Sequence, residues 1–577
     1  MSVAFDKTYD AILAAMTGPG TQLEVHEAAI GGNTLPMFKN VPATMADFLK
    51  LALLHGDKEF IVYEGERYTF AQTYARAEAL AACLQNDWHV AKGDRVVIAM
   101  RNYPEWIFAF MAIAMIGAIA VPLNAWWQAE EFTYALSDSD ARLAIADEER
   151  ASRLAQVPHE QRPPVLVVRP SGFVNGGMTA LSDSVFESGA KPTPVAIDPE
   201  DDLSIMYTSG STGYPKGAVS RQRGMVSAVF NYTAAGLTML QITMQDAAAR
   251  GETVDPNAMP QPVALLPVPL FHITGLVPIL LVCFVIGRKL VIMHKWDVVT
   301  AFRLIEQEKV TYFTGVPTMS LELMQHPDRD KFDLSSLVDI GGGGAARPAE
   351  HVGRLKAAFP GRNPGIGYGL TETNGVGAMN SRESYYDKPT STGRPTRPLV
   401  EMKIAGDDGA ALPTGAVGEV CIRSICNVRG YWKKPEATAE AFTTDGWFRT
   451  GDLGYLDDEG YLFIVDRKKD IIIRGGENIA CLEVESAIYH HPAVAEVAVF
   501  GLPDERLGEI VGAVVYLKPG ERVDAEDLRD YLAQHLAAFK IPARIWLVAD
   551  PLPKLGSGKI DKVMLRKAYR ELAKAVA

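Results

Sequence analysis

The sequence predicts an α/β protein: a large N-terminal domain of layered α/β subdomains and a small C-terminal α+β domain on a hinge. The chain has 577 residues, more than one hydrophobic core usually supports. From about residue 60, short β-branched runs alternate with alanine-rich helical stretches, which favours layers built on largely parallel sheets. Near residue 465 a strand gives way abruptly to a charged run. We therefore expect two domains, at residues 1–465 and 466–577.

The alternation of strands and helices is clearest in the first third of the chain. Arg95–Ala99 predicts a strand and 104–116 a helix, followed by a strand at Ala118–Leu123 and a helix at Ala129–Leu136. Three later β-branched runs also predict strands, namely Val165–Val168, Val263–Leu266 and Lys289–Ile292.

Two apolar stretches have to be tested against membrane insertion. Trp106–Leu123 is nearly long enough to span, but Gly117 and Pro122 interrupt it, so it predicts a buried helix and a strand. Leu276–Ile286 is too short to span. We expect both to lie in the core and predict no integral membrane segment.

Two other segments have no clear periodic pattern. Residues 1–45 predict an irregular lead-in, and residues 241–262, which are polar and contain Pro and Gly, predict a surface insertion. The C-terminal domain predicts a helix around 483–490, strands at Val494–Phe500 and Ile510–Leu517, and a helix at 524–537.

Composition limits the classes of partner. Hydrophobic residues make up 48% and charged residues 22%, as in an ordinary globular protein, and the net charge of −13 argues against nucleic acid or anionic lipid. The five cysteines show no metal-binding spacing and fit a reducing compartment. The first residues lack the pattern of a secretory signal. We expect a cytoplasmic protein. The sequence does not decide between a monomer and a homodimer.

The segment Tyr207–Gly217, YTSGSTGYPKG, is rich in glycine and hydroxyl side chains and follows an apolar strand. Glycines let backbone N–H groups turn toward an anion, hydroxyls add donors, and Lys216 adds a positive charge. A Gly/Ser surface turn is the alternative. The common phosphate-loop pattern does not fit, since Pro215 and Gly217 stand where it needs glycine and a hydroxyl. We interpret the segment as a different kind of phosphate-binding loop.

This loop and six further motifs, in order along the chain, resemble the adenylate-forming superfamily of acyl-CoA synthetases, luciferases and peptide-synthetase adenylation domains. The six motifs are Pro269–His272, Tyr368–Glu372, Gly418–Glu419, Gly446–Asp452, Asp466–Lys469 and Gly556–Lys559. The resemblance covers most of the chain but neither 1–45 nor 241–262. It implies ATP, Mg²⁺ and coenzyme A, with a carboxylic acid joined first to AMP and then to a thiol.

The resemblance also implies roles for individual residues in adenylation. Asp452 would hold the ribose hydroxyls, Tyr368 would stack near adenine, and Thr371 would contact phosphate. The residues implied to act in catalysis are Lys559, Thr208, His272 and Glu372, of which Glu372 and Thr208 would bind the metal. The nucleotide contacts implied are Thr208, Ser209, Gly210, Ser211, Thr212, Gly213, Lys216, Gly343, Ala345, Tyr368, Gly369, Thr371, Asp452, Arg467 and Lys559. One departure stands out: Gly341–Gly344 and Arg347 occupy a stretch where many relatives read Gly-Gly-Ala-Pro.

Three further groups follow from the same resemblance. The acyl pocket would include His272, Phe313, Gly315, Gly341 and Gly342. Coenzyme A would pass Gly475, Gly476 and Glu477, although these glycines would serve equally in a hairpin turn. The hinge would comprise Asp466 and Lys469. His272 is interpreted as a gate beside the pocket, with a buried core histidine as the alternative.

The expected activity is that of an acyl-CoA synthetase in fatty-acid and lipid metabolism. The small, uncharged pocket segments favour a medium- or long-chain, or bulky ring-bearing, apolar acid over acetate. Three alternatives remain open: a ligase that loads a carrier-protein thiol, a luciferase-like oxidase, and a non-catalytic ATP- or lipid-binding relative. The non-catalytic alternative is disfavoured because the sequence contains all three of the implied site residues Lys559, Glu372 and Asp452.

Overall fold

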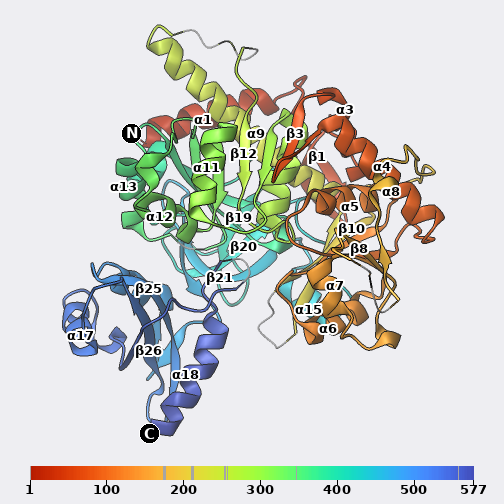
Figure 1. Ribbon diagram of the computed structural model, residues 1–577. Coiled ribbons are helices and arrows are strands. Elements are labelled where there is room, and N and C mark those ends of the chain that lie inside the picture. Colours follow the sequence, from red (N-terminus) through yellow and green to blue (C-terminus); the bar gives the residue numbers. More distant parts are fainter. Residues whose placement is uncertain are drawn as a thin grey trace.

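The computed structural model describes residues 2–172, 174, 177–208, 214–252, 255, 258–345, 347–555 and 558–576. A large body of stacked sheets and helices holds most of the chain, and a small domain formed by the C-terminal residues lies beside it (Figure 1). This arrangement confirms the predicted fold class.

Two large sheets form the frame of the large domain. The first follows the order β11 (Lys216–Arg221), β10 (Asp202–Thr208), β6 (Ile119–Pro122), β5 (Arg95–Ala99), β7 (Ala141–Asp147), β8 (Val165–Val168) and β9 (Thr179–Ala180). The second follows the order β18 (Arg394–Pro395), β17 (Gly377–Ser381), β16 (Asn363–Gly369), β15 (Asp339–Gly342), β14 (Tyr312–Gly315), β12 (Val263–Leu266), β13 (Lys289–Ile292), β3 (Glu59–Tyr63) and β4 (Glu66–Thr69). Their central strands pair in parallel, and the edge pairs β10–β11, β16–β17, β17–β18 and β3–β4 are antiparallel.

Helices pack around and between these sheets. The main helices of the large domain are α4 (Phe70–Asn86), α5 (Pro104–Met115), α6 (Ala129–Ser139), α7 (Glu148–Leu154), α9 (Gln222–Ala249), α11 (Val298–Glu308), α12 (Pro317–Gln325), α13 (Ala349–Ala358), α14 (Arg382–Asp387) and α15 (Pro435–Ala441). Shorter ones are α2 (Met45–Leu49), α3 (Ala52–His55), α8 (Asp183–Phe186) and α10 (Val282–Ile286). Helix α5 is buried and belongs to one core cluster with side chains from both sheets, as its apolar sequence predicted.

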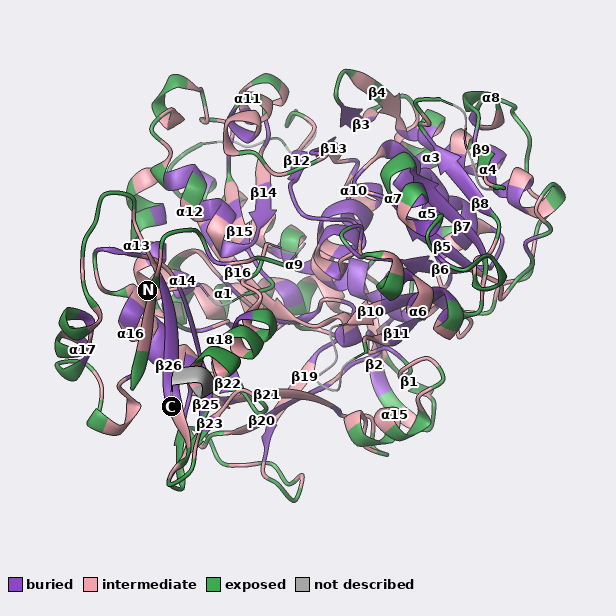
Figure 2. Cartoon of the chain, turned by 60° about the horizontal axis from the view of Figure 1, so that its bottom comes forward, coloured by how far each residue is buried: buried purple, intermediate pink, exposed green. Residues whose placement is uncertain are grey.

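A third, antiparallel sheet leads to the small domain. It consists of β19 (Glu401–Ala405), β20 (Gly418–Arg423), β21 (Phe448–Leu456) and β22 (Leu462–Arg467). The small domain contains β23 (Ile472–Arg474), β24 (Glu477–Ile479), β25 (Val494–Asp504), β26 (Gly508–Leu517) and β27 (Arg544–Val548), with α16 (Cys481–Tyr489), α17 (Ala525–Ala533) and α18 (Lys562–Val576). Figure 2 shows buried residues concentrated in the sheets and exposed ones on α17 and α18. The predicted strands and helices of this domain are present, with ends that differ by a few residues.

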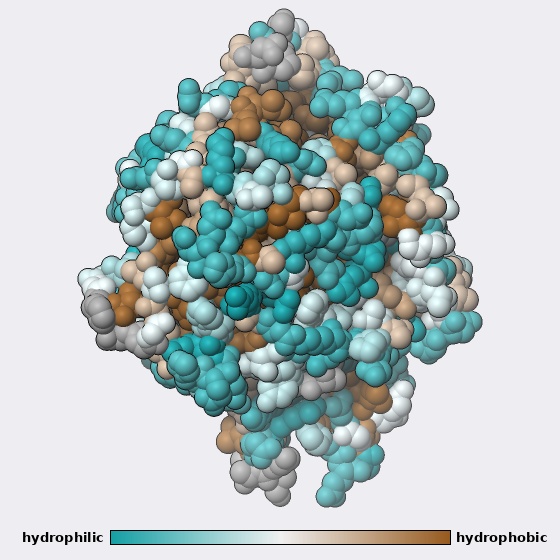
Figure 3. Space-filling model, turned by 90° about the vertical axis from the view of Figure 1, so that its right-hand side faces the viewer, coloured by the Kyte–Doolittle hydropathy of each residue, from teal (hydrophilic) through white to brown (hydrophobic). Residues whose placement is uncertain are grey.

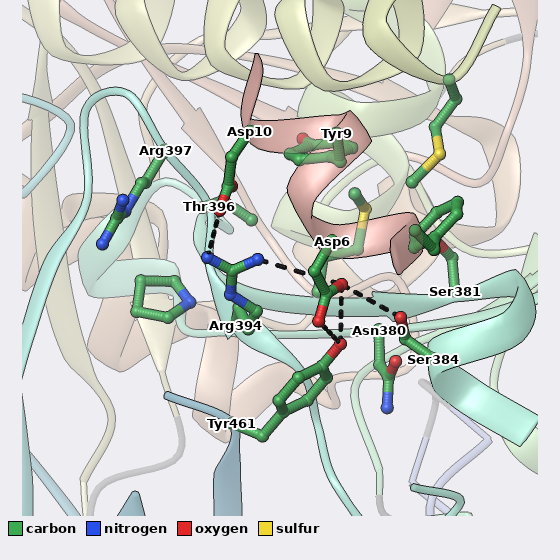
Figure 4. A pocket seen from close by; sticks show the side chains of 14 residues that line it. Asp6, Tyr9, Asp10, Asn380, Ser381, Ser384, Arg394, Thr396, Arg397 and Tyr461 are labelled. Atoms are coloured by element: carbon green, nitrogen blue, oxygen red, sulfur yellow. Dashed lines mark hydrogen bonds and ion pairs between the residues drawn. The ribbon is translucent and has the colours of Figure 1, made fainter. Parts of the chain in front are cut away.

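The prediction of an irregular lead-in was wrong. Residues 1–45 contain helix α1 (Ser2–Thr17) and the hairpin of β1 (Val25–Ile30) and β2 (Asn33–Phe38). Helix α1 is held by tertiary contacts: Leu13 packs in the core, and the carboxylate of Asp6 accepts hydrogen bonds from the hydroxyls of Tyr461 and Ser384. Figure 4 shows Asp6 pointing from α1 toward these two side chains and Arg394. Such contacts, distant in sequence, override a weak local pattern.

Residues 241–262 form the predicted surface insertion only in part, because they begin with a helical stretch. Helix α9 continues to Ala249 before the chain turns at Gly251, so the first nine residues are helical and only the rest is irregular where described. Most of the segment is exposed, as expected, and the end of α9 projects from the large domain (Figure 1). Gln241–Ala249 contains good helix formers, and the helix therefore extends beyond the part that packs.

Helix α9 is also long and apolar enough to cross a membrane by length and composition. Its most apolar window has a mean hydropathy of 1.2, and 67% of that window is buried inside the protein, as in a core helix. On the side of the molecule at the right of Figure 1, hydrophobic groups lie scattered among hydrophilic ones (Figure 3). The two stretches predicted to be core, 106–123 and 276–286, are largely buried.

Candidate active site

The carboxylate of Asp452 lies at the junction of three strands. Asp452 is in β21 and only 4% exposed, and it pairs in register with Arg467 of β22. Its Oδ2 accepts a hydrogen bond from the Tyr368 hydroxyl at 2.7 Å, and its Oδ1 lies 3.0 Å from Nε of Arg467. Burial and this carboxylate raise the pKa of Tyr368, so the phenol stays a neutral donor. Three residues predicted to contact the nucleotide are thereby in direct contact.

Glu372 is the second buried carboxylate of the site. It lies in the short 3₁₀ helix η4 (Thr371–Thr373), which follows β16, and is 8% exposed. Its Oε1 accepts a hydrogen bond from the Tyr431 hydroxyl at 2.9 Å, and the Nζ of Lys216 lies 5.2 Å from the centroid of the Tyr431 ring. Burial raises the pKa of Glu372, while the hydrogen bond from Tyr431 lowers it. Tyr431 thus links Glu372 to Lys216.

The two ends of the predicted phosphate loop are adjacent. Strands β10 and β11 pair antiparallel, with Thr208 opposite Lys216, and the Thr208 hydroxyl donates to the Lys216 carbonyl at 3.3 Å. Gly217 is required here, because a Cβ would lie 2.5 Å from Ile205. The predicted contacts Ser209, Gly210, Ser211, Thr212 and Gly213 lie outside the described residues.

The predicted adenine-side residues lie where β15 and β16 end. Gly343 forms a bridge with Gly367 and donates its N–H to the Gly315 carbonyl at 3.1 Å, and Ala345 is exposed. Only glycine fits at position 369, because a Cβ there would lie 2.0 Å from the Gly375 carbonyl oxygen. Thr371 is partly exposed at the start of η4.

Lys559 reaches this region from the C-terminal domain. Its carbonyl accepts a hydrogen bond from the Leu555 N–H at 2.7 Å. A Cβ at Gly344 would lie 3.2 Å from Cε of Lys559, so the lysine rests on the adenine-side loop. Although Lys559 is exposed as a residue, partial desolvation of its ammonium and the positive charge of Arg467 lower its pKa to about 8, while Asp452 raises it. Lys559 therefore titrates close to neutral pH.

His272 is fixed on the loop that follows β12. The Asn102 side chain clamps this loop, because its amide donates to the Val268 carbonyl at 3.0 Å and its oxygen accepts from the Leu270 N–H at 2.9 Å. Burial and the Lys559 charge lower the pKa of His272 to about 3, so the ring is neutral at neutral pH. Its buried Nε2 has no hydrogen-bond partner among the described residues.

The other predicted acyl-pocket residues lie on two faces of the sheet. Phe313 and Gly315 lie on one face of β14, where Phe313 is fully buried and the Sδ of Met319 is 2.9 Å from a Cβ at Gly315. Gly341 and Gly342 are consecutive in β15 and so point to opposite faces. The space beside Gly342 is filled by the guanidinium of Arg347, whose Nη2 is 2.3 Å from a Cβ there.

Among the described residues, those predicted to bind coenzyme A form no hydrogen bond or ion pair with the site around Asp452. Gly475 and Gly476 form the turn between β23 and β24, with φ of 60° and 91°, so the hairpin alternative describes their local structure. Both glycines and Glu477 are exposed. No hydrogen bond or ion pair among the described residues links them to Asp452 or Lys559.

The predicted hinge residues lie where the chain leaves β22. The buried Asp466 accepts hydrogen bonds from the N–H groups of Arg467 at 2.7 Å and Leu482 at 3.3 Å, and burial raises its pKa to about 6. Lys468 donates its N–H to the Gly451 carbonyl at 2.8 Å. Lys469 is exposed, and partial desolvation of its ammonium together with the charge of Arg467 lowers its pKa. The domain boundary at 465/466 stays a prediction.

A magnesium ion fits these residues only together with a substrate. In the described part of the chain, no group of three or more His, Cys, Asp or Glu side chains could hold a metal. Mg²⁺ typically takes one or two carboxylates and completes its shell with water and phosphate oxygens. Glu372 offers one carboxylate, and the Thr208 hydroxyl lies at the phosphate loop. This donor set suits a metal that arrives with a nucleotide.

Comparison with known families identifies two matches. Residues 50–432 match the AMP-binding enzyme family, and residues 483–559 match the AMP-binding enzyme C-terminal domain. The first match begins after α1 and the β1–β2 hairpin and contains Glu372 and Tyr431. The second contains Lys559.

Similar proteins act on different acids. The chain is 35% identical to a long-chain-fatty-acid–CoA ligase of Mycobacterium tuberculosis, over 87% of this chain and 93% of that protein. It is 34% identical to a feruloyl-CoA synthase of Amycolatopsis, over 86% of this chain and 94% of that protein. Among solved structures, an anthranilate–CoA ligase in complex with anthranoyl-AMP is 26% identical with a TM-score of 0.79, covering 93% of this chain and 99% of that one. ATP-bound MatB from Rhodopseudomonas palustris is 27% identical with a TM-score of 0.77, covering 91% and 99%.

Arg467→Gln should raise the pKa of Lys559, because the positive charge of Arg467 is one of the two causes that lower it. In the unmodified protein the ammonium form is lost as the pH rises through about 8, and in the variant it should persist to higher pH. NMR titration of ¹³C-methylated lysine measures this pKa. Asp452→Asn is the opposite control, since removing the carboxylate should lower the pKa further. A pKa that is unchanged in both variants would show that these charges do not act on Lys559.

Proposed function

Because the chain belongs to the AMP-binding, or adenylate-forming, enzyme family, we propose that it is an acyl-CoA synthetase for a medium- or long-chain, or bulky ring-bearing, apolar acid. ATP, Mg²⁺ and coenzyme A are the cofactors of this family of acid–CoA ligases. The observation that carries the proposal is the meeting of Lys559, from the C-terminal domain, with the Asp452–Tyr368 pair of the large domain. Residues from both domains thus lie close together at one site.

In the proposed first step, a carboxylate oxygen attacks the α-phosphorus of ATP. A P–O bond forms, the bond to the bridging oxygen breaks, and pyrophosphate leaves with the electron pair. Asp452 would hold the ribose, Tyr368 would lie against adenine, and the Gly-rich loop and Lys216 would bind the departing phosphates. Mg²⁺ held by Glu372 would neutralise phosphate charge when bound.

Lys559 has the most direct role in this step. Its ammonium, beside Gly344, would lie between the carboxylate and the α-phosphate as negative charge develops there. Lys559 is exposed in this structure, so a substrate that fills the site would displace water from its ammonium and strengthen the attraction to the anion. The neutral His272 would border the acyl pocket without competing for the anion.

The second step, transfer of the acyl group to the thiol of coenzyme A, requires a different arrangement. The thiolate attacks the carbonyl carbon, and AMP leaves with the electron pair of the acyl–phosphate bond. The hairpin of Gly475 and Gly476 is exposed away from Asp452, so we propose that rotation about Lys469 brings it to the site. We also propose residues 1–465 and 466–577 as the two bodies that move.

The nature of the acid is the finer part of the proposal. The predicted pocket segments are uncharged and glycine-rich, which supports an apolar acid larger than acetate, and similar proteins act on fatty and on aromatic acids. Coenzyme A is preferred to a carrier-protein thiol because the named relatives are CoA ligases. A cytoplasmic location stays a prediction, which four buried free cysteines and one partly buried free cysteine favour.

A panel of carboxylic acids tests the function. With ATP, Mg²⁺ and coenzyme A, we expect AMP, pyrophosphate and an acyl thioester, with the highest kcat/KM for an acid larger than acetate. Release is measured by a coupled pyrophosphate assay, and the thioester by mass spectrometry. ADP and phosphate as the only nucleotide products would refute the reaction class. A kcat/KM for acetate above that of every fatty and aryl acid would refute the substrate class alone. Transfer to a carrier protein but not to coenzyme A would support the alternative acceptor.

Mutation should separate the two steps. Lys559→Ala should slow acyl-AMP formation about 10²–10³-fold, the usual cost of removing a donor that stabilises the transition state, yet still convert supplied acyl-AMP to thioester. Lys469→Pro should do the reverse, because proline fixes one torsion at the hinge. No described backbone hydrogen bond uses the Lys469 N–H, so proline removes none in the observed pose.

Pre-steady-state rates of each step in each variant are the measurement. Lys554→Ala, in the same turn as Lys559, and Lys469→Ala, which leaves the hinge free, are the matched controls. Equal loss of both steps in Lys559→Ala would show that the C-terminal domain does not alternate between two poses.

A further inference from the structure

One buried charge in the large domain has no part in the chemistry described above. Arg347 lies before α13 and is 5% exposed. Its polar contacts are neutral: Nη1 donates to the Gly365 carbonyl at 3.0 Å, and Nη2 lies 3.5 Å from the Ser320 hydroxyl. The guanidinium carbon is 5.9 Å from the centroid of the Tyr385 ring. Among the described residues no carboxylate forms an ion pair with it, and its Nε has no hydrogen-bond partner. A buried cation without a counter-charge is unfavourable, so a role other than stability is expected.

The position of Arg347 connects two strands. Its guanidinium fills the space beside Gly342 at the end of β15, where any larger residue would collide with it. Its bond to the Gly365 carbonyl reaches β16, two residues before Gly367, which forms the bridge with Gly343. One side chain thus links the end of β15 to β16.

The loop after β15 and the last residues of β16 bind the nucleotide in the proposed function. Gly343–Ala345 follows β15 and is the predicted adenine-side loop, and Tyr368 lies at the end of β16 in contact with Asp452. Gly344 is also the residue on which Lys559 rests. Arg347 therefore sits directly beneath the surface that adenine and Lys559 would share.

We propose that Arg347 is a positioning residue for adenylation, whose guanidinium holds the loop Gly343–Ala345 against β16 so that ATP meets a preformed surface. It acts through the loop and touches no reacting atom. The proposal rests on the proposed function, because it needs ATP to bind at this loop. It also accounts for the departure from the common Gly-Gly-Ala-Pro pattern: an arginine of this kind needs a glycine at 342 to accommodate its side chain.

Arg347→Met tests the proposal, because methionine fills a similar space without charge or hydrogen bonds. Replacing an uncompensated buried cation with an apolar side chain should leave Tm unchanged or raise it. We expect the KM for ATP to rise about tenfold, which corresponds to about 1.4 kcal/mol of binding free energy, while the KM for coenzyme A changes less than twofold. Arg354→Met, at an exposed arginine of α13, the helix that follows Arg347, is the matched control and should match the unmodified enzyme in both constants.

Arg347→Lys provides a second variant if the first does not fold. Lysine keeps the charge but lacks the planar fork that reaches two partners, so the KM for ATP should still rise, by less than in Arg347→Met. A lower Tm with a KM for ATP within twofold of the unmodified enzyme, in whichever variants fold, would overturn the proposal and leave Arg347 a structural residue. An unmodified enzyme that releases no pyrophosphate with any acid would instead refute the proposed function.

Discussion

The ion pair and hydrogen bond made by the carboxylate of Asp452 are the interactions on which the candidate site depends. One oxygen binds the hydroxyl of Tyr368, at the end of the nine-stranded sheet, and the other pairs with Arg467, at the end of the strand that leads to the small domain. The buried carboxylate of Asp452, in the antiparallel sheet, thereby connects β16 of the nine-stranded sheet to Arg467 at the start of the predicted hinge. Removing one partner would leave a buried charge unpaired, which is costly.

The charges around this carboxylate are arranged for an anionic ligand. Arg467 and Lys559 are close enough that the arginine lowers the pKa of the lysine, and partial desolvation of the ammonium lowers it further. Two cations held near each other favour a polyanion that neutralises both, and ATP is such a ligand. Neutral His272 and the partly buried, neutral Tyr368 add no competing charge. We therefore attribute the proposed reactivity of the site to the electrostatic environment around Asp452.

Much of the fold could be predicted from local sequence. The strands at 95–99, 165–168, 263–266 and 289–292 appear with the predicted bounds, because buried parallel strands are short β-branched runs between turns. Helix α1 could not, since Asp6 and Leu13 are stabilised by partners hundreds of residues away. The helical end of α9 was missed because its polar composition was taken for a loop, although the helix formers continue to Ala249.

For the candidate site, ordered motifs predicted a set of residues but not how the fold joins them. Asp452, Tyr368 and Arg467 come together as their motifs implied, and Lys559 approaches Gly344. Tyr431 was missed, because only the fold brings it to Glu372 and no local pattern marks it. Arg347 was visible as a departure from a common pattern, but its burial and its neutral partners required the structure.

The central claim is that one site, built by both domains, activates an acid by transfer of AMP before any thiol takes part. Exchange of labelled pyrophosphate into ATP, measured with Mg²⁺ and an accepted carboxylic acid but without coenzyme A, tests this claim most directly. The account predicts exchange that depends strictly on the acid and proceeds without coenzyme A, because acyl-AMP formation is reversible on the enzyme. Exchange that needs no acid, or that starts only when coenzyme A is added, would contradict it.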